Sequence, residues 1–252
     1  MSSALQSDIA DGLSSSRGAV RRQPALPGRP PLTLPTDTRV RVWDLPTRVF
    51  HWALLAAVVG AVASAKAGLM DWHPRFGYAV FALVAFRLLW GVVGGRWSRF
   101  ASFVRGPGTV WRYLRGNASA GERLDVGHNP LGALSVLALL AVLAVQVGTG
   151  LVSDDEIAFV GPLNALVSTD TGLAATSWHR GWGQWLLFGL VGLHVAAIVA
   201  YAVRGQRLVP AMWHGDKTLP ATTPPSADGL AQRLLAAVLL AGCAVGVWWV
   251  VT

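Results

Sequence analysis

The sequence is poor in charged residues. Only 13% of its 252 residues are Asp, Glu, Lys or Arg, whereas 53% are hydrophobic and the mean hydropathy is positive. An ordinary soluble domain carries about 25% charged residues, so the composition excludes that class and indicates an integral membrane protein. The twelve Trp agree with this, because indole places an apolar body and one N–H group well at a membrane interface.

Cysteine is also nearly absent. Cys243 is the single cysteine, so no disulfide can form within the chain. The chain has no C-x-x-C-H stretch, which excludes covalent attachment of a c-type haem. Any haem in this protein would therefore be held by coordination alone.

The first 38 residues lack a sustained apolar run. They are rich in Ser, Gly, Pro and Arg, and we expect a disordered tail. With neither an apolar segment nor a cleavage site near the start, we do not expect a secretory signal.

Five later stretches approach the roughly 20 apolar residues that cross a bilayer as a helix. They lie near residues 47–66, 75–94, 131–151, 183–203 and 232–251. Pro74 and Pro130 stand at expected first helical turns, where proline is tolerated. We therefore expect an all-α membrane protein with a four-helix core over 39–205, a loop over 206–231 and an extra span over 232–252.

The distribution of Lys and Arg predicts the orientation. Seventeen of them fall on the side that holds the N-terminus, and three, Lys66, Arg75 and Arg180, fall on the other side. By the positive-inside rule the N-terminus and the loop 206–231 are cytoplasmic. The net charge of +8 follows this topology, so it does not indicate a nucleic-acid partner.

Four of the six histidines lie at the ends or inside the expected spans: His51, His73, His179 and His194. A separation of 15 residues puts the last two about 22 Å apart along one helix and about 60° apart around it. His73 and His179 then share the outer level, and His51 and His194 share the inner half. Each pair could bind one iron, and bis-histidine ligation of haem leaves no position for oxygen, which favours electron transfer.

Other interpretations of these residues stay open. A membrane histidine can simply be a hydrogen-bonding structural residue. Arg87 could contact a haem propionate on the inner side, or its side chain could snorkel to the interface. Arg75 and Arg180 could contact haem propionates on the outer side. His51 lies about four residues inside its span and His194 about ten from the end of its own. Their depths agree only if the first span begins earlier or the helices tilt.

Four motifs resemble the prokaryotic cytochrome b561 family, which is similar to the b-type cytochrome subunits of nickel hydrogenases and formate dehydrogenases. The motifs are "VWDLPTRVFHW", "HPRFGYAVFALVAFRLLWGVVG", "GHNPLGALSVLALLAVLAVQVGTGL" and "WHRGWGQWLLFGLVGLHVAAIVAY". The resemblance implies a four-helix bundle in the bacterial inner membrane. It implies two b haems, one on His51 and His194 and one on His73 and His179. It also implies electron transfer between a periplasmic redox partner and the membrane quinone pool.

His128 and Asn129 precede the third expected span, on the side of the inner histidine pair. A quinone carbonyl needs a hydrogen-bond donor at the membrane edge, and a neighbouring group that titrates near neutral pH can exchange the accompanying proton. The alternative is structural, with Asn129 capping the third helix. On the outer side, Trp178, Arg180 and Trp182 offer another pocket.

We therefore expect a di-haem cytochrome whose periplasmic partner is a c-type cytochrome or a dehydrogenase or hydrogenase subunit. Whether the chain itself completes an enzymatic reaction is left open. One rival is a transporter for nickel or copper, and another is a non-catalytic anchor subunit. The fifth span lies outside the family core, and the small residues of "GCAVG" at 242–246 could contact a partner helix in a homo- or hetero-oligomer.

Overall fold

The computed structural model describes residues 37–117, 122–157 and 159–252. Residues 1–36 of the tail expected over 1–38 lie outside the described residues. Its last two residues, Asp37 and Thr38, belong to a strand that begins at Asp37. The described elements in chain order are β1 (Asp37–Arg41), α1 (Leu45–Lys66), α2 (His73–Val93), α3 (Phe100–Phe103), α4 (Pro107–Leu114), α5 (Pro130–Val152), a 3-10 turn (Asn164–Leu166), α6 (Thr169–Arg180), α7 (Trp182–Val203), α8 (Leu208–His214), β2 (Asp216–Pro220) and α9 (Leu230–Val251).

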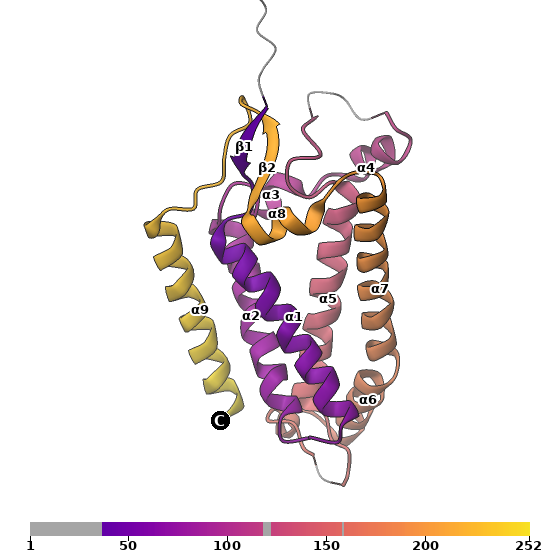
Figure 1. The fold of residues 1–252 in the computed structure, drawn as a ribbon. Coiled ribbons are helices and arrows are strands. Elements are labelled where there is room, and N and C mark those ends of the chain that lie inside the picture. Colours follow the sequence, from indigo (N-terminus) through magenta and orange to yellow (C-terminus); the bar gives the residue numbers. More distant parts are fainter. Residues whose placement is uncertain (1–36, 118–121, 158) are drawn as a thin grey trace, which may run out of the picture. The chain divides into compact units, whose positions relative to one another are not determined.

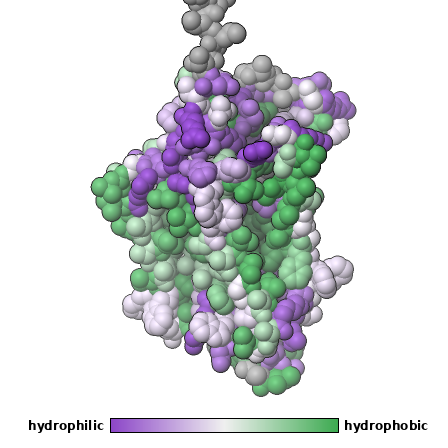
Figure 2. All heavy atoms as spheres, in the orientation of Figure 1, coloured by the Kyte–Doolittle hydropathy of each residue, from purple (hydrophilic) through white to green (hydrophobic). Residues whose placement is uncertain are grey.

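Five described helical segments are long and apolar enough to cross a membrane: α1, α2, α5, α6 with α7, and α9. The bounds of α1, α2, α5, α7 and α9 differ from the expected spans by at most two residues. Figure 2 shows the hydrophobic belt that these helices form between two more polar ends. We call these ends the sheet end, which carries β1 and β2, and the α6 end (Figure 1).

Local sequence explains where the long helices begin. Asp44 caps α1 by accepting a hydrogen bond from Thr47 N at 2.8 Å, and Asn129 caps α5 by accepting one from Gly132 N at 2.7 Å. Proline stands in the first turn of α1, α2 and α5, where its missing N–H group is no loss. The predicted helix starts at Pro74 and Pro130 and the capping role of Asn129 are confirmed.

The core lies between α1, α2, α5 and α7, with α9 packed against the outside of α2 (Figure 1). Its buried side chains are apolar and come from all five helices: Phe50, Ala57, Val80, Leu83, Val84, Phe86, Trp90, Leu140, Leu143, Leu187 and Ala236. Gly60 permits the close approach of α1 and α2, because a Cβ atom there would lie 2.6 Å from the Phe76 ring. The fifth span is therefore attached to the core through α2.

The expected loop over 206–231 contains α8 and β2. The strand β2 pairs antiparallel with β1, and Arg41 lies opposite Asp216, with its Nε 2.7 Å from the Asp216 carboxylate. Neither strand is apolar, and their partners lie far apart in the sequence, so local patterning gives no sign of this small sheet.

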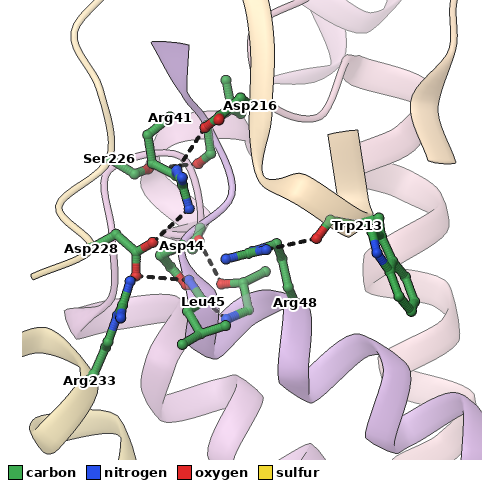
Figure 3. Close-up of polar contacts among 12 residues, drawn as sticks. Arg41, Asp44, Leu45, Arg48, Trp213, Asp216, Ser226, Asp228 and Arg233 are labelled. Carbon is green, nitrogen blue, oxygen red and sulfur yellow. Dashed lines mark hydrogen bonds and ion pairs between the residues drawn. The ribbon is translucent and has the colours of Figure 1, made fainter. Parts of the chain in front are cut away.

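Asp228 ties α9 to the rest of the sheet end (Figure 3). Its carboxylate accepts hydrogen bonds from Leu45 N at 3.0 Å, from Arg41 Nη1 at 2.9 Å and from Arg233 Nε at 3.2 Å. Burial opposes ionisation, but the Leu45 hydrogen bond and the two arginines outweigh it and lower the pKa of Asp228. We call these four residues the Asp228 clamp.

Two glycines of α9, Gly242 and Gly246, have open surroundings in the described part of the chain. No described atom outside α9 lies within 4 Å of the position that a Cβ atom would take at Gly242 or Gly246, whereas Cys243 packs toward the core. A partner helix at "GCAVG" therefore stays a prediction.

Candidate functional site

Two histidines face each other at the α6 end of the bundle. His73 begins α2 and His179 lies near the end of α6, with ring centroids 5.8 Å apart and ring planes at 86°. A metal–imidazole bond is about 2 Å long, so two rings that share one metal ion stand about 6 Å apart centre to centre. The observed separation fits a pair of ligands to one iron.

Both rings are oriented by neighbouring helices. His73 Nδ1 lies 2.8 Å from the Ala61 carbonyl oxygen of α1, and His179 Nδ1 lies 2.9 Å from the Gln146 carbonyl oxygen of α5. A carbonyl oxygen only accepts, so each Nδ1 carries the proton and donates. This fixes the tautomer in which Nε2 has a free lone pair for a metal.

A cavity of about 550 Å³ lies beside this histidine pair. Apolar side chains of α1, α2, α5 and α7 dominate its lining, and Gly77 and Gly150 leave their sides without a Cβ atom. The cavity is also lined by Lys66 and Arg180, two cations suited to carboxylates such as haem propionates. Arg75, the other arginine expected here, instead lies over the Trp72 ring at 5.0 Å.

The second histidine pair lies toward the sheet end. His51 of α1 and His194 of α7 are close enough to interact electrostatically. The start of α1 at Leu45 puts His51 six residues inside its helix, and His194 lies nine residues before the end of α7. The depth mismatch found in the sequence thus shrinks to three residues, or about 4.5 Å. His51 Nδ1 is buried and has no hydrogen-bond partner among the described residues.

Arg87 is buried rather than snorkelled, with 3% of its surface exposed. Its Nη2 donates to the Ser98 carbonyl oxygen at 3.1 Å, and its guanidinium lies 4.7 Å from the Phe100 ring centre. Its Nη1 is buried without a partner in the described part of the chain. This leaves the two N–H groups of Nη1 on a permanent cation available for a buried anion at the sheet end.

His128 is enclosed by two aromatic rings, with centroid separations of 4.6 Å to Trp43 and 4.7 Å to Phe103. Burial, helped by the charges of Arg87 and Lys217, lowers the pKa of His128 to about 3. His128 is therefore neutral at pH 7, so it offers a ligand its hydrogen-bonding atoms rather than a charge. Its Nδ1 is buried and unpartnered among the described residues.

Asn129 has a structural role that is fully visible. Besides capping α5, it donates from Nδ2 to Tyr201 Oη of α7 at 2.6 Å. Tyr113 lies next in this chain of polar groups, and burial together with its hydrogen bond to Tyr201 raises the pKa of Tyr113 to about 12.

Sequence reasoning missed Asp44, which stands in the motif that also holds His51. Asp44 is fully buried and accepts from Thr47 N, from Trp90 Nε1 at 3.2 Å and from Ser98 Oγ at 2.7 Å. It thereby joins the start of α1, the end of α2 and the loop after α2. Two of its three partners lie about 50 residues away in the sequence, so local patterning gave no signal for this role.

Sequence reasoning also missed Gln146, although the sequence itself marks this residue as a functional candidate. Gln146 is the single amide side chain of α5, whose other polar side chains are the hydroxyls of Ser135 and Thr149, and a polar residue inside a span is by default a functional candidate. Its backbone and side chain both contact His179.

Apolar spanning helices that enclose opposed histidines beside a cavity define a b-type membrane cytochrome, a class that carries electrons through haem. The chain belongs to the prokaryotic cytochrome b561 family, whose model matches residues 42–215. The match includes His51, His73, His179 and His194 and ends before α9. A comparison with curated proteins found no match.

Membership of this family shows several general properties of the chain. The family binds haem b, and the chain is a multi-pass bacterial membrane protein of electron transfer. The residues present fit a haem, because His73 and His179 have the separation and tautomer of paired ligands and stand beside an apolar cavity.

Proposed function

We propose that the chain is a di-haem cytochrome that passes electrons between a periplasmic redox partner and the membrane quinone pool. The opposed rings of His73 and His179 carry this proposal, since each is anchored through Nδ1 with Nε2 free. Haem b supplies reversible one-electron chemistry when it is held between two imidazoles.

The residues of the chain have distinct tasks in this proposal. His73 and His179 hold one haem at the α6 end, and His51 and His194 hold the second toward the sheet end. Lys66 and Arg180 neutralise carboxylates at the first site, and the free Nη1 of Arg87 does so at the second. The apolar walls exclude water and so influence the redox potential.

Haem content tests the proposal directly. A reduced-minus-oxidised spectrum of the purified protein should show b-type haem, and pyridine haemochrome analysis should return about two haems per chain. One haem per chain would mean that one pair is structural, and none would overturn the proposal. The transporter has less support, because no group of three or more His, Cys, Asp or Glu in the described residues is arranged to hold a metal ion.

We propose that the sheet end faces the cytoplasm and the α6 end faces the periplasm. The excess of Lys and Arg on the side of the sheet end supports this. The α6 end carries Asp154, Glu156 and Asp170, which favour a basic partner surface such as that of a c-type cytochrome, or a dehydrogenase or hydrogenase subunit. A reporter active only in the cytoplasm should work when fused after Arg115 and fail after Asp170; the reverse would exchange the two faces.

The quinone is proposed to exchange electrons near His128 and Asn129. His128 Nδ1 is a buried polar atom without a described partner, between the aromatic walls of Trp43 and Phe103. Asn129 contributes by holding the start of α5 in place.

The variant His128→Phe keeps an aromatic ring there and removes both nitrogens. Stopped-flow haem reduction by a quinol should slow about tenfold or more, because losing a hydrogen bond to a developing charge costs roughly 1.5–3 kcal/mol. Asn129→Ala should cost about 1 kcal/mol of stability as a lost cap. Unchanged reduction by His128→Phe at full haem content would move the quinone site to Trp178, Arg180 and Trp182 at the α6 end.

A further inference from the structure

The helix α5 contributes no histidine to either pair, yet it holds His179 from two sides. The carbonyl oxygen of Gln146 accepts from His179 Nδ1 at 2.9 Å, and the side-chain Nε2 of Gln146 donates to the His179 carbonyl oxygen at 3.2 Å. Thr149 Oγ1 lies 3.3 Å from the same Nδ1. One residue of α5 thus contacts both the ring and the main chain of a single histidine.

The position of His179 in the fold makes this second contact important. His179 is the next-to-last residue of α6. The helix ends at Gly181, which has φ −99° and ψ −110°, and α7 begins at the next residue. The last carbonyls of a helix have no donor within that helix, so an outside donor must satisfy them. The Gln146 amide does this for His179 at the junction of α6 and α7.

The surrounding residues make room for this arrangement. A Cβ atom at Gly183 would collide with Gln146 Oε1, and one at Gly150 would lie 3.2 Å from His179 Cε1. Gln146 Oε1 is buried without a partner among the described residues, which is a cost to stability. Packing alone therefore does not account for a glutamine at this place, because an apolar side chain would avoid that cost.

We propose that Gln146 is the positioning residue of the α6-end site, and this rests on the proposed function of His73 and His179 as ligands of one haem. Gln146 fixes the main chain of His179 with its side chain and the ring tautomer with its carbonyl oxygen. His179 Nε2 is thereby left free to bind iron, on a ring whose centre lies 5.8 Å from that of His73. The third span of the bundle, which has no ligand, acts on the haem through this residue.

A redox consequence follows. An imidazole whose Nδ1–H group donates to a carbonyl is a more basic ligand, which favours ferric iron and lowers the reduction potential. When the main chain of His179 is no longer held by the Gln146 amide, the Nδ1 hydrogen bond weakens as well. The potential of the α6-end haem should then rise, while that of the sheet-end haem stays unchanged.

Gln146→Met tests this, because methionine has a similar length and no N–H donor. In the purified holoprotein, the α6-end haem should show a higher midpoint potential and an altered low-spin EPR signal. The α6-end haem should also transfer to apomyoglobin about tenfold faster, which is the effect expected when a metal-bound histidine loses a hydrogen-bond partner. The matched control is Gln232→Met on α9, since Gln232 does not line this cavity and has no hydrogen bond to either histidine in the described chain.

A second variant guards against a folding defect in the first. Gly183→Ala places a methyl group where Gln146 Oε1 lies, so it should displace the amide and give the same three changes. Wild-type potential, EPR signal and haem transfer in Gln146→Met would overturn the positioning role, as would equal changes in Gln232→Met. Failure of the proposed function looks different, because the wild-type protein would then contain no α6-end haem.

Discussion

The two histidine levels are built in different ways. At the α6 end, both rings donate from Nδ1 to main-chain carbonyls and stand beside an open cavity. Toward the sheet end, Nδ1 of His51 is buried without a partner among the described residues. Support there comes from the start of α1, the end of α2 and the loop after α2, which Asp44 holds together.

The histidines of the two proposed cofactor sites are therefore held in place in two different ways. The α6-end histidines are oriented by residues in direct contact with their rings, so their geometry depends on one or two contacts of each ring. The sheet-end pair depends on the correct placement of whole helices, because its visible supports contact the start of α1 and the end of α2. Changes remote from the ligands should therefore affect the sheet-end haem more than the α6-end haem.

The largest effect is expected from filling the cavity at the α6 end. Gly77 lines it, and nothing described lies within contact distance of a Cβ atom built there. Gly77→Leu should therefore occupy space that the haem needs, and the α6-end haem should be lost while the sheet-end haem remains. Visible spectra with haemochrome analysis measure this.

The control for that variant is Gly242→Leu on α9, a glycine with equally open surroundings. It should keep both haems. Full haem content in Gly77→Leu would show that the cavity is not the cofactor site and would remove the contrast between the two ends.

A smaller but still large effect is expected at Asp44. Asp44→Ala removes the buried acceptor of Trp90 Nε1 and Ser98 Oγ and the cap of α1. Leaving such groups unsatisfied should cost about 3 kcal/mol of unfolding free energy. The sheet-end haem should be lost first, as measured by thermal denaturation followed at the haem bands.

Ser168→Ala provides the comparison at the other end, since Ser168 caps α6 through Thr171 N. It should cost only about 1 kcal/mol, because it removes one partly exposed cap. If Asp44→Ala released the α6-end haem first, the sheet end would not depend on this network.

The smallest effect is expected from the Asp228 clamp. The folded protein lowers the pKa of Asp228, so the clamp contributes its full stability above the unfolded pKa of about 4. That contribution is lost as the pH falls through the lower pKa of the folded state. Amide exchange at the start of α9 should accelerate only in acid.

In Asp228→Asn the same amides should exchange faster already at pH 7, with little further change in acid. Both haem spectra should stay constant in this range for the variant, because the clamp contacts α9, α1 and β1 but no histidine. A shift of the sheet-end haem together with the exchange rate would mean that α9 belongs to the haem site.

Much of the fold was predictable because its signals are local. Runs of apolar residues placed the spans to within two residues, and Pro130 with the cap of Asn129 marked a helix start. The histidines were found as candidates because a polar ring in a span is costly. Their facing geometry at the α6 end was predicted as a shared depth, and the observed ring separation agrees with it.

The remaining features depend on contacts between distant residues. The pairing of β1 with β2 joins segments about 180 residues apart, and His128 is enclosed by Trp43 and Phe103 from two other parts of the chain. A proton-exchanging His128 was expected from its ordinary pKa, whereas burial keeps it neutral at pH 7. Such burial cannot be inferred from neighbours in the sequence.

The proposed function places two haems, each held by one histidine pair, at opposite ends of the bundle. Redox titration of four single variants, His51→Ala, His73→Ala, His179→Ala and His194→Ala, tests it most directly. We predict that His73→Ala and His179→Ala lose the same spectral component, and that His51→Ala and His194→Ala lose the other. Loss of one common component from His51→Ala and His73→Ala would contradict the pairing.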